Sequence, residues 1–188
     1  MSKIQTLAAA ALLAACQGAA AFDLTSPDIH QGKLMAKAQE YNGFGCNGGN
    51  VSPALSWSHA PKGTKSFAVT VYDPDAPTGS GWWHWVIFNI PANVHELARD
   101  AGNPASGLAP QGSTQSRTDY GTAGFGGACP PQGDKPHRYQ FKVFALDVEH
   151  LDLGQDSSAA LVGFMLNAHK LGTARIEARY GRKKAAAQ

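Results

Sequence analysis

The sequence predicts a mainly β protein that folds as a single domain. Glycine and proline are frequent, with 21 and 11 residues in a chain of 188, and both residue types favour the turns that connect short strands. Several segments alternate apolar and polar residues, the pattern of a strand with one face in the core. The length suits one domain of ordinary size and is short for two.

The first residues have the pattern of a secretory leader. Lys3 precedes an apolar run from Leu7 to Ala15 and the small residues Gly18 to Ala21, so we assign residues 1–21 to a signal peptide. The run is too short to span a membrane, and no later stretch is long and apolar enough. We therefore expect a periplasmic or secreted protein. The alternative is a lipoprotein signal, Leu13 to Cys16, with the lipid anchor at Cys16.

Strands are predicted where the alternation is clearest. In Ser66 to Tyr72, residues Phe67, Val69 and Val71 share one face. Trp82 to Ile90 is apolar at both odd and even positions, which indicates a central strand covered on both sides. The remaining predicted strands are Phe22 to Ile29 as a short strand or extended arm, one at the end of the loop Gly43 to Trp57, Arg138 to Val148, and Thr173 to Tyr180.

One helix is predicted, from Ser157 to Leu171, with Ser157 or Asp156 as its N-cap and Gly172 ending it. Its predicted core-facing residues are Leu161, Met165 and Ala168. The segment Ala92 to Tyr120 contains many glycines and prolines and has little periodicity, so it is expected to be a long surface loop with short pieces of structure. Residues 182–188 are predicted to form a flexible basic tail.

Charge and cysteine content limit the possible partners and the compartment. The formal net charge is only +2, which gives no reason to expect nucleic acid as the partner. If Cys16 is removed or lipidated, Cys46 and Cys129 remain as a pair, and a disulfide between them is expected in an oxidising compartment. Two buried free thiols are the alternative. A zinc site is less favoured because neither cysteine has a second ligand nearby in sequence.

Three clusters of residues remain that could carry chemistry. They are Asp73 and Asp75 with His84 between two tryptophans, the glycine-rich loop Gly121 to Gly133, and His137-Arg138-Tyr139 at the head of a predicted strand. Each one alone has an ordinary structural explanation, since an aspartate in an Asp-Pro turn usually bonds its own backbone and glycine-rich segments are mostly loops.

Taken together, the clusters suggest a pocket for an anion. His84 and His137 could donate N–H groups and Tyr139 a hydroxyl, and glycines would let backbone N–H groups approach an anion closely. Asp73 would repel an anion directly, but it could accept a hydrogen bond from an imidazole and fix its tautomer. No nucleophile elbow and no zinc-protease motif is present in the sequence.

These motifs also resemble a known family. DPDAP, the following GWWHW and the later GGACPP with HRY after it are similar to the phosphatidylethanolamine-binding proteins, and GFGCNGGNVSPALSW and SSAALVG are similar to their bacterial YbhB/YbcL branch, also called Raf kinase inhibitor-like. The resemblance implies a β-sandwich of two antiparallel sheets with a few peripheral helices, in a domain of residues 22–181.

The resemblance also implies a small pocket for phosphate or a phosphorylated head group. Its expected ligand-binding residues are Asp73, Asp75, His84, Cys129, Pro130, Pro131, His137 and Tyr139, with the Cys-Pro-Pro run at the rim. Eukaryotic relatives have glycine in place of Cys129. The family further suggests a protein partner, through inhibition of a kinase or a protease. No cofactor is expected.

Several functions remain open from the sequence. The first hypothesis is an exported binding protein without enzymatic activity. The rival is a hydrolase of phosphoesters or esters in which His84 or His137 acts as general base, oriented by Asp73. A lesser hypothesis is a metal site made of His84, His137 and an aspartate.

Overall fold

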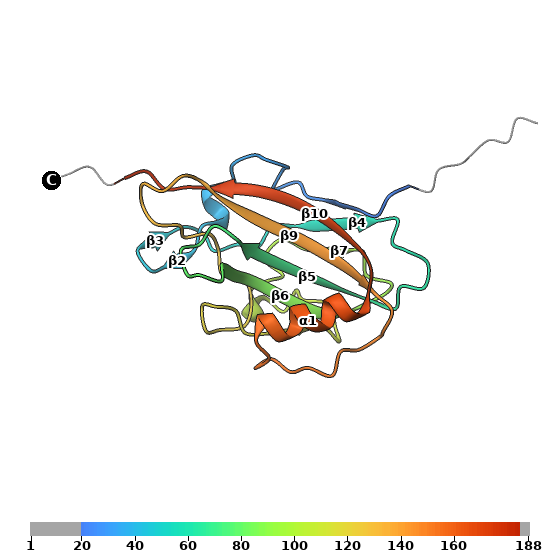
Figure 1. Ribbon diagram of the computed structural model, residues 1–188. Helices are drawn as coiled ribbons and strands as arrows, with labels where there is room; N and C mark the ends of the chain where they lie inside the picture. The colour runs from blue at the N-terminus through green and yellow to red at the C-terminus, as the bar shows by residue number, and fades with distance from the viewer. Residues whose placement is uncertain (1–19, 185–188) are drawn as a thin grey trace, which may run out of the picture.

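The computed structural model describes residues 20–184. Cys16 and all but the last two residues of the predicted signal peptide therefore lie outside the described residues. The described chain forms three antiparallel sheets and one α-helix (Figure 1). The strands are β1 Asp23–Thr25, β2 Asn42–Gly43, β3 Cys46–Asn47, β4 Leu55–Ser58, β5 Ser66–Asp73, β6 Trp82–Pro91, β7 Glu96–Leu97, β8 Thr114–Gln115, β9 His137–Leu146 and β10 Lys170–Tyr180; the helices are α1 Ala159–His169 and the 3₁₀ turns η1 Lys37–Gln39 and η2 Pro104–Ser106.

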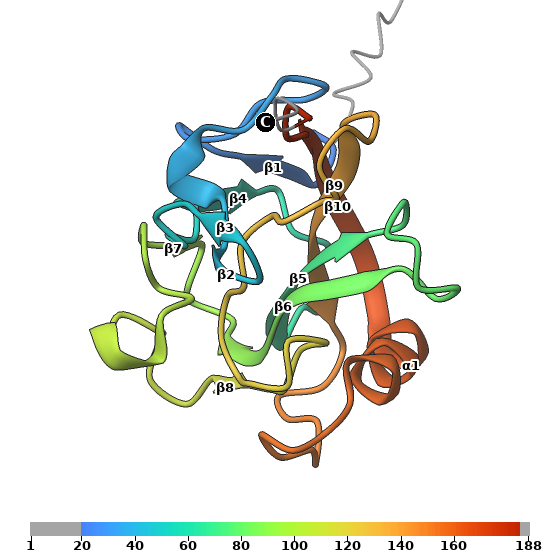
Figure 2. The same ribbon diagram turned by 90° about the vertical axis from the view of Figure 1, so that its left-hand side faces the viewer.

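The largest sheet has the strand order β10-β9-β5-β6-β8, and β1, β4 and β7 form a smaller one. Figure 2 shows β1 and β4 on one side of the large sheet and α1 on the other. The predicted mainly β fold is thus confirmed. Beyond the two expected sheets there is a third, the short hairpin of β2 and β3.

Each face of the large sheet packs against its own core. Phe67, Val69 and Val71 of β5 face the small sheet, where they meet Trp57 of β4, whereas Ala68 belongs to the core under α1. Strand β6 contributes to both cores, which confirms that it is covered on both sides. Because alternate residues of a strand point to opposite faces, the predicted alternation in β5 is also confirmed.

The helix differs from its prediction in both register and length. Ser158 is the N-cap, and its side chain accepts a hydrogen bond from the N–H of Leu161. Helix α1 buries Ala159, Val162 and Leu166. Of the predicted core-facing residues, Met165 packs against this core, whereas Leu161 is 45% exposed and Ala168 is also exposed, so the prediction was wrong for these two. Nor does Gly172 end the helix, because the chain becomes strand β10 at Lys170.

The Asp-Pro turn and the long loop bring the site residues together. The turn between β5 and β6 contains no regular structure, as predicted, and the N–H of Asp75 donates to Oδ1 of Asp73 at 2.8 Å. The loop Ala92 to Tyr120 holds β7, η2 and β8.

Arg182, in the predicted flexible tail, is held by hydrogen bonds to the carbonyl oxygens of Pro130 and Gly45, at 2.7 and 2.8 Å.

Candidate functional site

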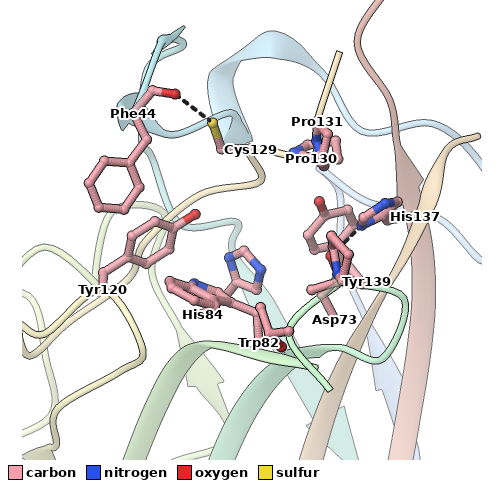
Figure 3. A pocket seen from close by; sticks show the side chains of 13 residues that line it. Phe44, Asp73, Trp82, His84, Tyr120, Cys129, Pro130, Pro131, His137 and Tyr139 are labelled. Atoms are coloured by element: carbon pink, nitrogen blue, oxygen red, sulfur yellow. Dashed lines mark hydrogen bonds and ion pairs between the residues drawn. The ribbon is translucent and has the colours of Figure 1, made fainter. Parts of the chain in front are cut away.

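A cavity of about 180 Å³ opens where β5, β6 and β9 meet the loops (Figure 3). Seven of the eight predicted ligand-binding residues line it. They are Asp73, His84, Cys129, Pro130, Pro131, His137 and Tyr139. Phe44, Ala76, Pro77, Thr78, Trp82 and Tyr120 complete the lining.

A bulge in β6 turns His84 towards this cavity. Val71 pairs with Trp85 and Tyr72 pairs with Trp83, so His84 is an extra residue opposite a single step of β5. A β-bulge changes the direction of side chains next to it. His84 and Trp85 consequently both contact the loop that contains Phe125, Gly126 and Gly127.

The ring of His84 has a defined tautomer. Its Nδ1 lies 2.8 Å from the carbonyl oxygen of Gly126 and 3.1 Å from that of Gly127. Carbonyl oxygens only accept, so Nδ1 carries the hydrogen. The side chain is almost fully buried, and this burial lowers the pKa of His84, against the opposing effects of the two carbonyls and of Asp73. His84 is therefore neutral at neutral pH.

Asp73 orients His137, and not His84. Nδ1 of His137 lies 2.7 Å from Oδ2 of Asp73, and both side chains are buried. On the other side of the ring, Nε2 of His137 lies 3.6 Å from the carboxylate of Asp134, which is about half exposed. Asp73 thus accepts a hydrogen bond from one of the two histidines, and it lines the cavity itself.

Three buried polar atoms of the lining have no hydrogen-bond partner. They are Nε1 of Trp82, Nε2 of His84 and the hydroxyl of Tyr139. Burial raises the pKa of the Tyr139 hydroxyl, and the charge of Asp73 adds to this effect, so the hydroxyl keeps its proton and can donate. Unpartnered buried polar atoms are rare in folded proteins, and their presence in one cavity points to a ligand that completes their bonding.

Two glycines of the glycine-rich loop have backbone N–H groups that are already bonded. The N–H of Gly126 donates to the carbonyl of His84, and that of Gly127 to Oδ1 of Asn50, so neither is free for an anion. A Cβ at Gly127 would lie only 2.4 Å from the carbonyl oxygen of Gln39. Glycine is needed there because two backbones approach closely.

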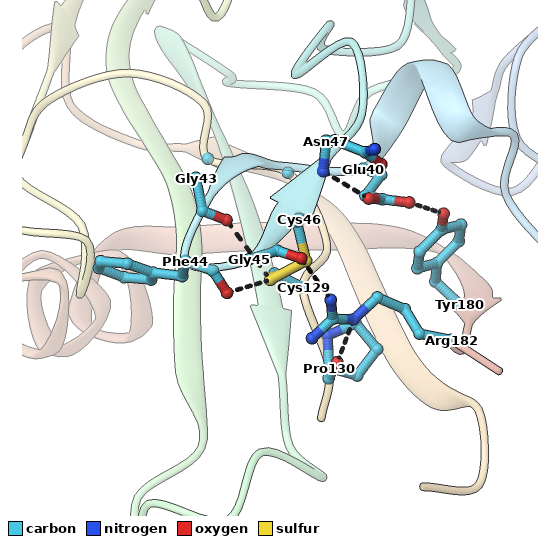
Figure 4. Close-up of a disulfide and its surroundings, with 12 residues drawn as sticks. Glu40, Gly43, Phe44, Gly45, Cys46, Asn47, Cys129, Pro130, Tyr180 and Arg182 are labelled. Atoms are coloured by element: carbon cyan, nitrogen blue, oxygen red, sulfur yellow. Dashed lines mark hydrogen bonds between the residues drawn. A yellow bond between two sulfur atoms is a disulfide. The ribbon is translucent and has the colours of Figure 1, made fainter. Parts of the chain in front are cut away.

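A disulfide joins Cys46 to Cys129, which is one of the residues that line the cavity (Figure 4). It joins the hairpin of β2 and β3 to the loop that carries Pro130, which confirms the predicted pairing. Phe44 lies at the tip of this hairpin, where it is 71% exposed. Its ring lies 5.6 Å from that of Tyr120, another lining residue.

Comparison with known proteins gives a consistent result. The family model described as "Phosphatidylethanolamine-binding protein" matches residues 25–181. The chain is 60% identical over 158 residues to the UPF0098 protein YbcL of Escherichia coli, a match that covers 84% of this chain and 86% of YbcL. It is 48% identical over 157 residues to the UPF0098 protein YbhB of the same organism, covering 84% and 98% of the two chains.

The chain belongs to the phosphatidylethanolamine-binding protein family. The crystal structure of Escherichia coli YbcL superposes with a TM-score of 0.86 at 58% identity, covering 87% of this chain and all of that one. The predicted family and its bacterial YbhB/YbcL branch are therefore confirmed.

One predicted site residue of this family member lies elsewhere. Asp75 faces away from the cavity and binds Arg138 through the backbone N–H at 2.8 Å, Nε at 2.9 Å and Nη2 at 2.6 Å. Asp75 thus lies outside the cavity, because the strand ends at Asp73 and the turn points the next acid outwards. The prediction missed six lining residues, and one of them, Trp82, could have been found from the sequence. Trp82 lies two residues before His84 in the same strand, and residues two apart in a strand point to the same face.

The arrangement is unsuited to the lesser, metal-binding hypothesis. Within residues 20–184, no three His, Cys, Asp or Glu side chains lie close enough together to hold a metal ion. In the same part of the chain, no helix is long and apolar enough to cross a membrane.

Proposed function

We propose that this phosphatidylethanolamine-binding protein family member is a binding protein whose cavity takes phosphate or the phosphorylated head group of a small molecule or lipid. The observation that carries the proposal is the set of three unpartnered polar atoms, on Trp82, His84 and Tyr139, in one small cavity. The tryptophan N–H and the tyrosine hydroxyl are donors that a phosphate oxygen would accept from.

The lining offers no activated nucleophile, which favours binding over catalysis. Cys129 is in the disulfide, and the hydroxyl of Thr78 donates to the carbonyl of Gly81. A hydrolase remains the second candidate because His137 and Asp73 have the geometry of an oriented general base. Turnover of nitrophenyl phosphate and nitrophenyl acetate, abolished by His137→Ala, is the result that would establish it.

Titration calorimetry with phosphate and phosphoethanolamine tests the binding proposal. His84→Ala should weaken binding by about 1.5 to 3 kcal/mol, the usual cost of losing a hydrogen bond to a charged group. Asp75→Ala is the matched control, since Asp75 lies outside the cavity and should leave the affinity unchanged. If neither compound binds the wild type, the proposal is wrong.

We also propose that the protein acts outside the cytoplasm. Support comes from the leader-like residues 1–21 and from the Cys46–Cys129 disulfide, because disulfides persist in oxidising compartments. Mass spectrometry of the protein recovered from cells decides between cleavage after the small residues and a lipid on Cys16. A cytoplasmic, unprocessed chain would contradict export. The protein partner suggested by the family, a kinase or protease, stays a prediction.

A further inference from the structure

The polar atoms of the cavity restrict the protonation state of the ligand. Because Nδ1 of His84 carries the hydrogen, Nε2 presents a lone pair to the cavity and requires a donor. Trp82 Nε1 presents only a hydrogen and requires an acceptor. A ligand that satisfies both atoms must therefore carry a donor and an acceptor on the same compact group.

Burial keeps the ring of His84 neutral although two carboxylates act on it. Asp73 of β5 and Asp119 of the loop after β8 raise the pKa of His84, but burial lowers it by more. The rings of Tyr120 and Tyr139 pack edge-on against His84 at 5.6 and 5.1 Å. His137 of β9 lines the same cavity, already bonded to Asp73.

No fixed cation is available to balance a dianion in the cavity. Among the lining residues, all within the described chain, none is lysine or arginine. The buried carboxyl of Asp73 would repel each added negative charge at short range. A group with a single negative charge and one remaining proton avoids most of this repulsion and supplies the hydrogen that Nε2 of His84 needs.

The mouth of the cavity is apolar, in contrast to its floor. Phe44 stands on one side, and Pro130 and Pro131 on the other (Figure 3), while Pro77 belongs to the turn after β5. An exposed aromatic ring beside prolines suits an apolar substituent attached to the bound head group.

We propose that the cavity selects a phosphomonoester in its protonated, singly charged form, attached to an apolar group. The acidic O–H donates to His84, and the phosphoryl oxygens accept from Trp82 and Tyr139. A phosphodiester carries the same charge but has no O–H, so it leaves His84 without a donor. This inference rests on the proposed function and narrows its ligand class.

Two soluble probes test it with the purified full chain. They are phenyl phosphate, a monoester, and methyl phenyl phosphate, a diester of similar shape. Phenyl phosphate should bind about 25-fold more tightly at about pH 5.5 than at about pH 7.5, because the second phosphate pKa lies near 6. The diester should bind at least about tenfold more weakly at the lower pH. Equal affinity for both probes, or tighter monoester binding at the higher pH, overturns the inference.

Binding of neither probe, with no binding of inorganic phosphate, would instead overturn the proposed function. That outcome is distinct from equal binding of monoester and diester, which keeps the function and removes only the selectivity.

His84→Gln tests the role of the imidazole. Its amide can donate as well as accept, so the variant should lose most of the preference for the monoester over the diester at the lower pH. An unchanged preference in a folded variant would show that His84 is not the acceptor. The comparison of the two probes on the wild type does not depend on this variant.

Phe44→Ser tests the apolar mouth. The substitution should weaken the binding of phenyl phosphate and leave the binding of inorganic phosphate unchanged. Phe164→Ser is the matched control, because Phe164 lies on α1 away from the cavity and is equally exposed, at 70%. Equal losses in both variants would contradict a role for Phe44.

Vesicles identify the source of the monoester. Neutral vesicles with phosphatidic acid carry a phosphomonoester, and those with phosphatidylglycerol carry a diester. Binding to the phosphatidic acid vesicles alone supports a lipid ligand. If the protein binds phenyl phosphate but neither kind of vesicle, a small-molecule ligand is supported. Equal binding to both vesicles overturns the selectivity.

Discussion

Asp73 and His137 are 64 residues apart in the sequence and share a buried hydrogen bond of 2.7 Å between Oδ2 and Nδ1. This bond fixes β9 to the end of β5 and orients one wall of the cavity. Oδ1 of the same carboxyl accepts the N–H of Asp75. Both oxygens of Asp73 are therefore used as acceptors.

Asp73→Asn should lower the free energy of unfolding by about 1 to 3 kcal/mol, because the amide nitrogen must face one of two donors. Asp75→Asn is the control. Its carboxylate pairs with Arg138 near the surface, so its loss should cost about 1 kcal/mol or less. Urea denaturation measures both. Equal losses would mean that burial of the Asp73 pair does not matter.

Stability should depend on pH through His84. Burial lowers its pKa in the folded state, so the unfolded chain takes up the proton first as the pH falls. The free energy of unfolding in phosphate-free buffer should therefore decrease below about pH 6.5, with a slope of up to about 1.4 kcal/mol per pH unit. Subtracting the His84→Gln curve removes the other six histidines. A flat difference between the two curves contradicts the prediction.

The disulfide should contribute strongly to stability. Cys46 and Cys129 are 83 residues apart, and the chain-entropy model gives about 4 to 5 kcal/mol for a loop of that length. Guanidinium denaturation with and without reductant measures this difference. In a Cys16→Ser background, no thiol should react in denaturant until reductant is added; two reactive thiols would show that the bond does not form.

The buried face of α1 can be checked by paired substitutions. Leu166→Ala should lower the free energy of unfolding by about 2 to 5 kcal/mol, because Leu166 is fully buried against the large sheet. Leu161→Ala removes the same atoms from an exposed position and should cost less than about 0.5 kcal/mol. Similar losses at both positions would restore the face predicted from sequence.

The strands were predictable because alternation is a local signal. Phe67, Val69 and Val71 differ from their neighbours in polarity or size within one short segment, and tertiary contacts reinforce the same pattern. Helix α1 is apolar at most positions, so periodicity alone could not choose between Leu161 and Leu166. The sheet beneath the helix decides it.

Most of the cavity residues came from motif resemblance, since they lie on segments distant in sequence. The bulge at His84 and the hydrogen bonds of Gly126 and Gly127 depend on contacts between those segments, which no local pattern records. Phe44 reaches the cavity because the disulfide holds its hairpin there. Asp75 was misplaced because a turn, unlike a strand, does not keep side chains at alternate positions on one face.

Arg182 links the end of the chain to the cavity. Its guanidinium bonds the carbonyls of Pro130 and Gly45, one on each side of the disulfide. A protein that ends at Gly181 would keep every lining residue and yet lose both of these hydrogen bonds. Exoproteolysis that proceeds from the C-terminus past Arg182 would thus release the loop that carries Pro130 at the mouth of the cavity.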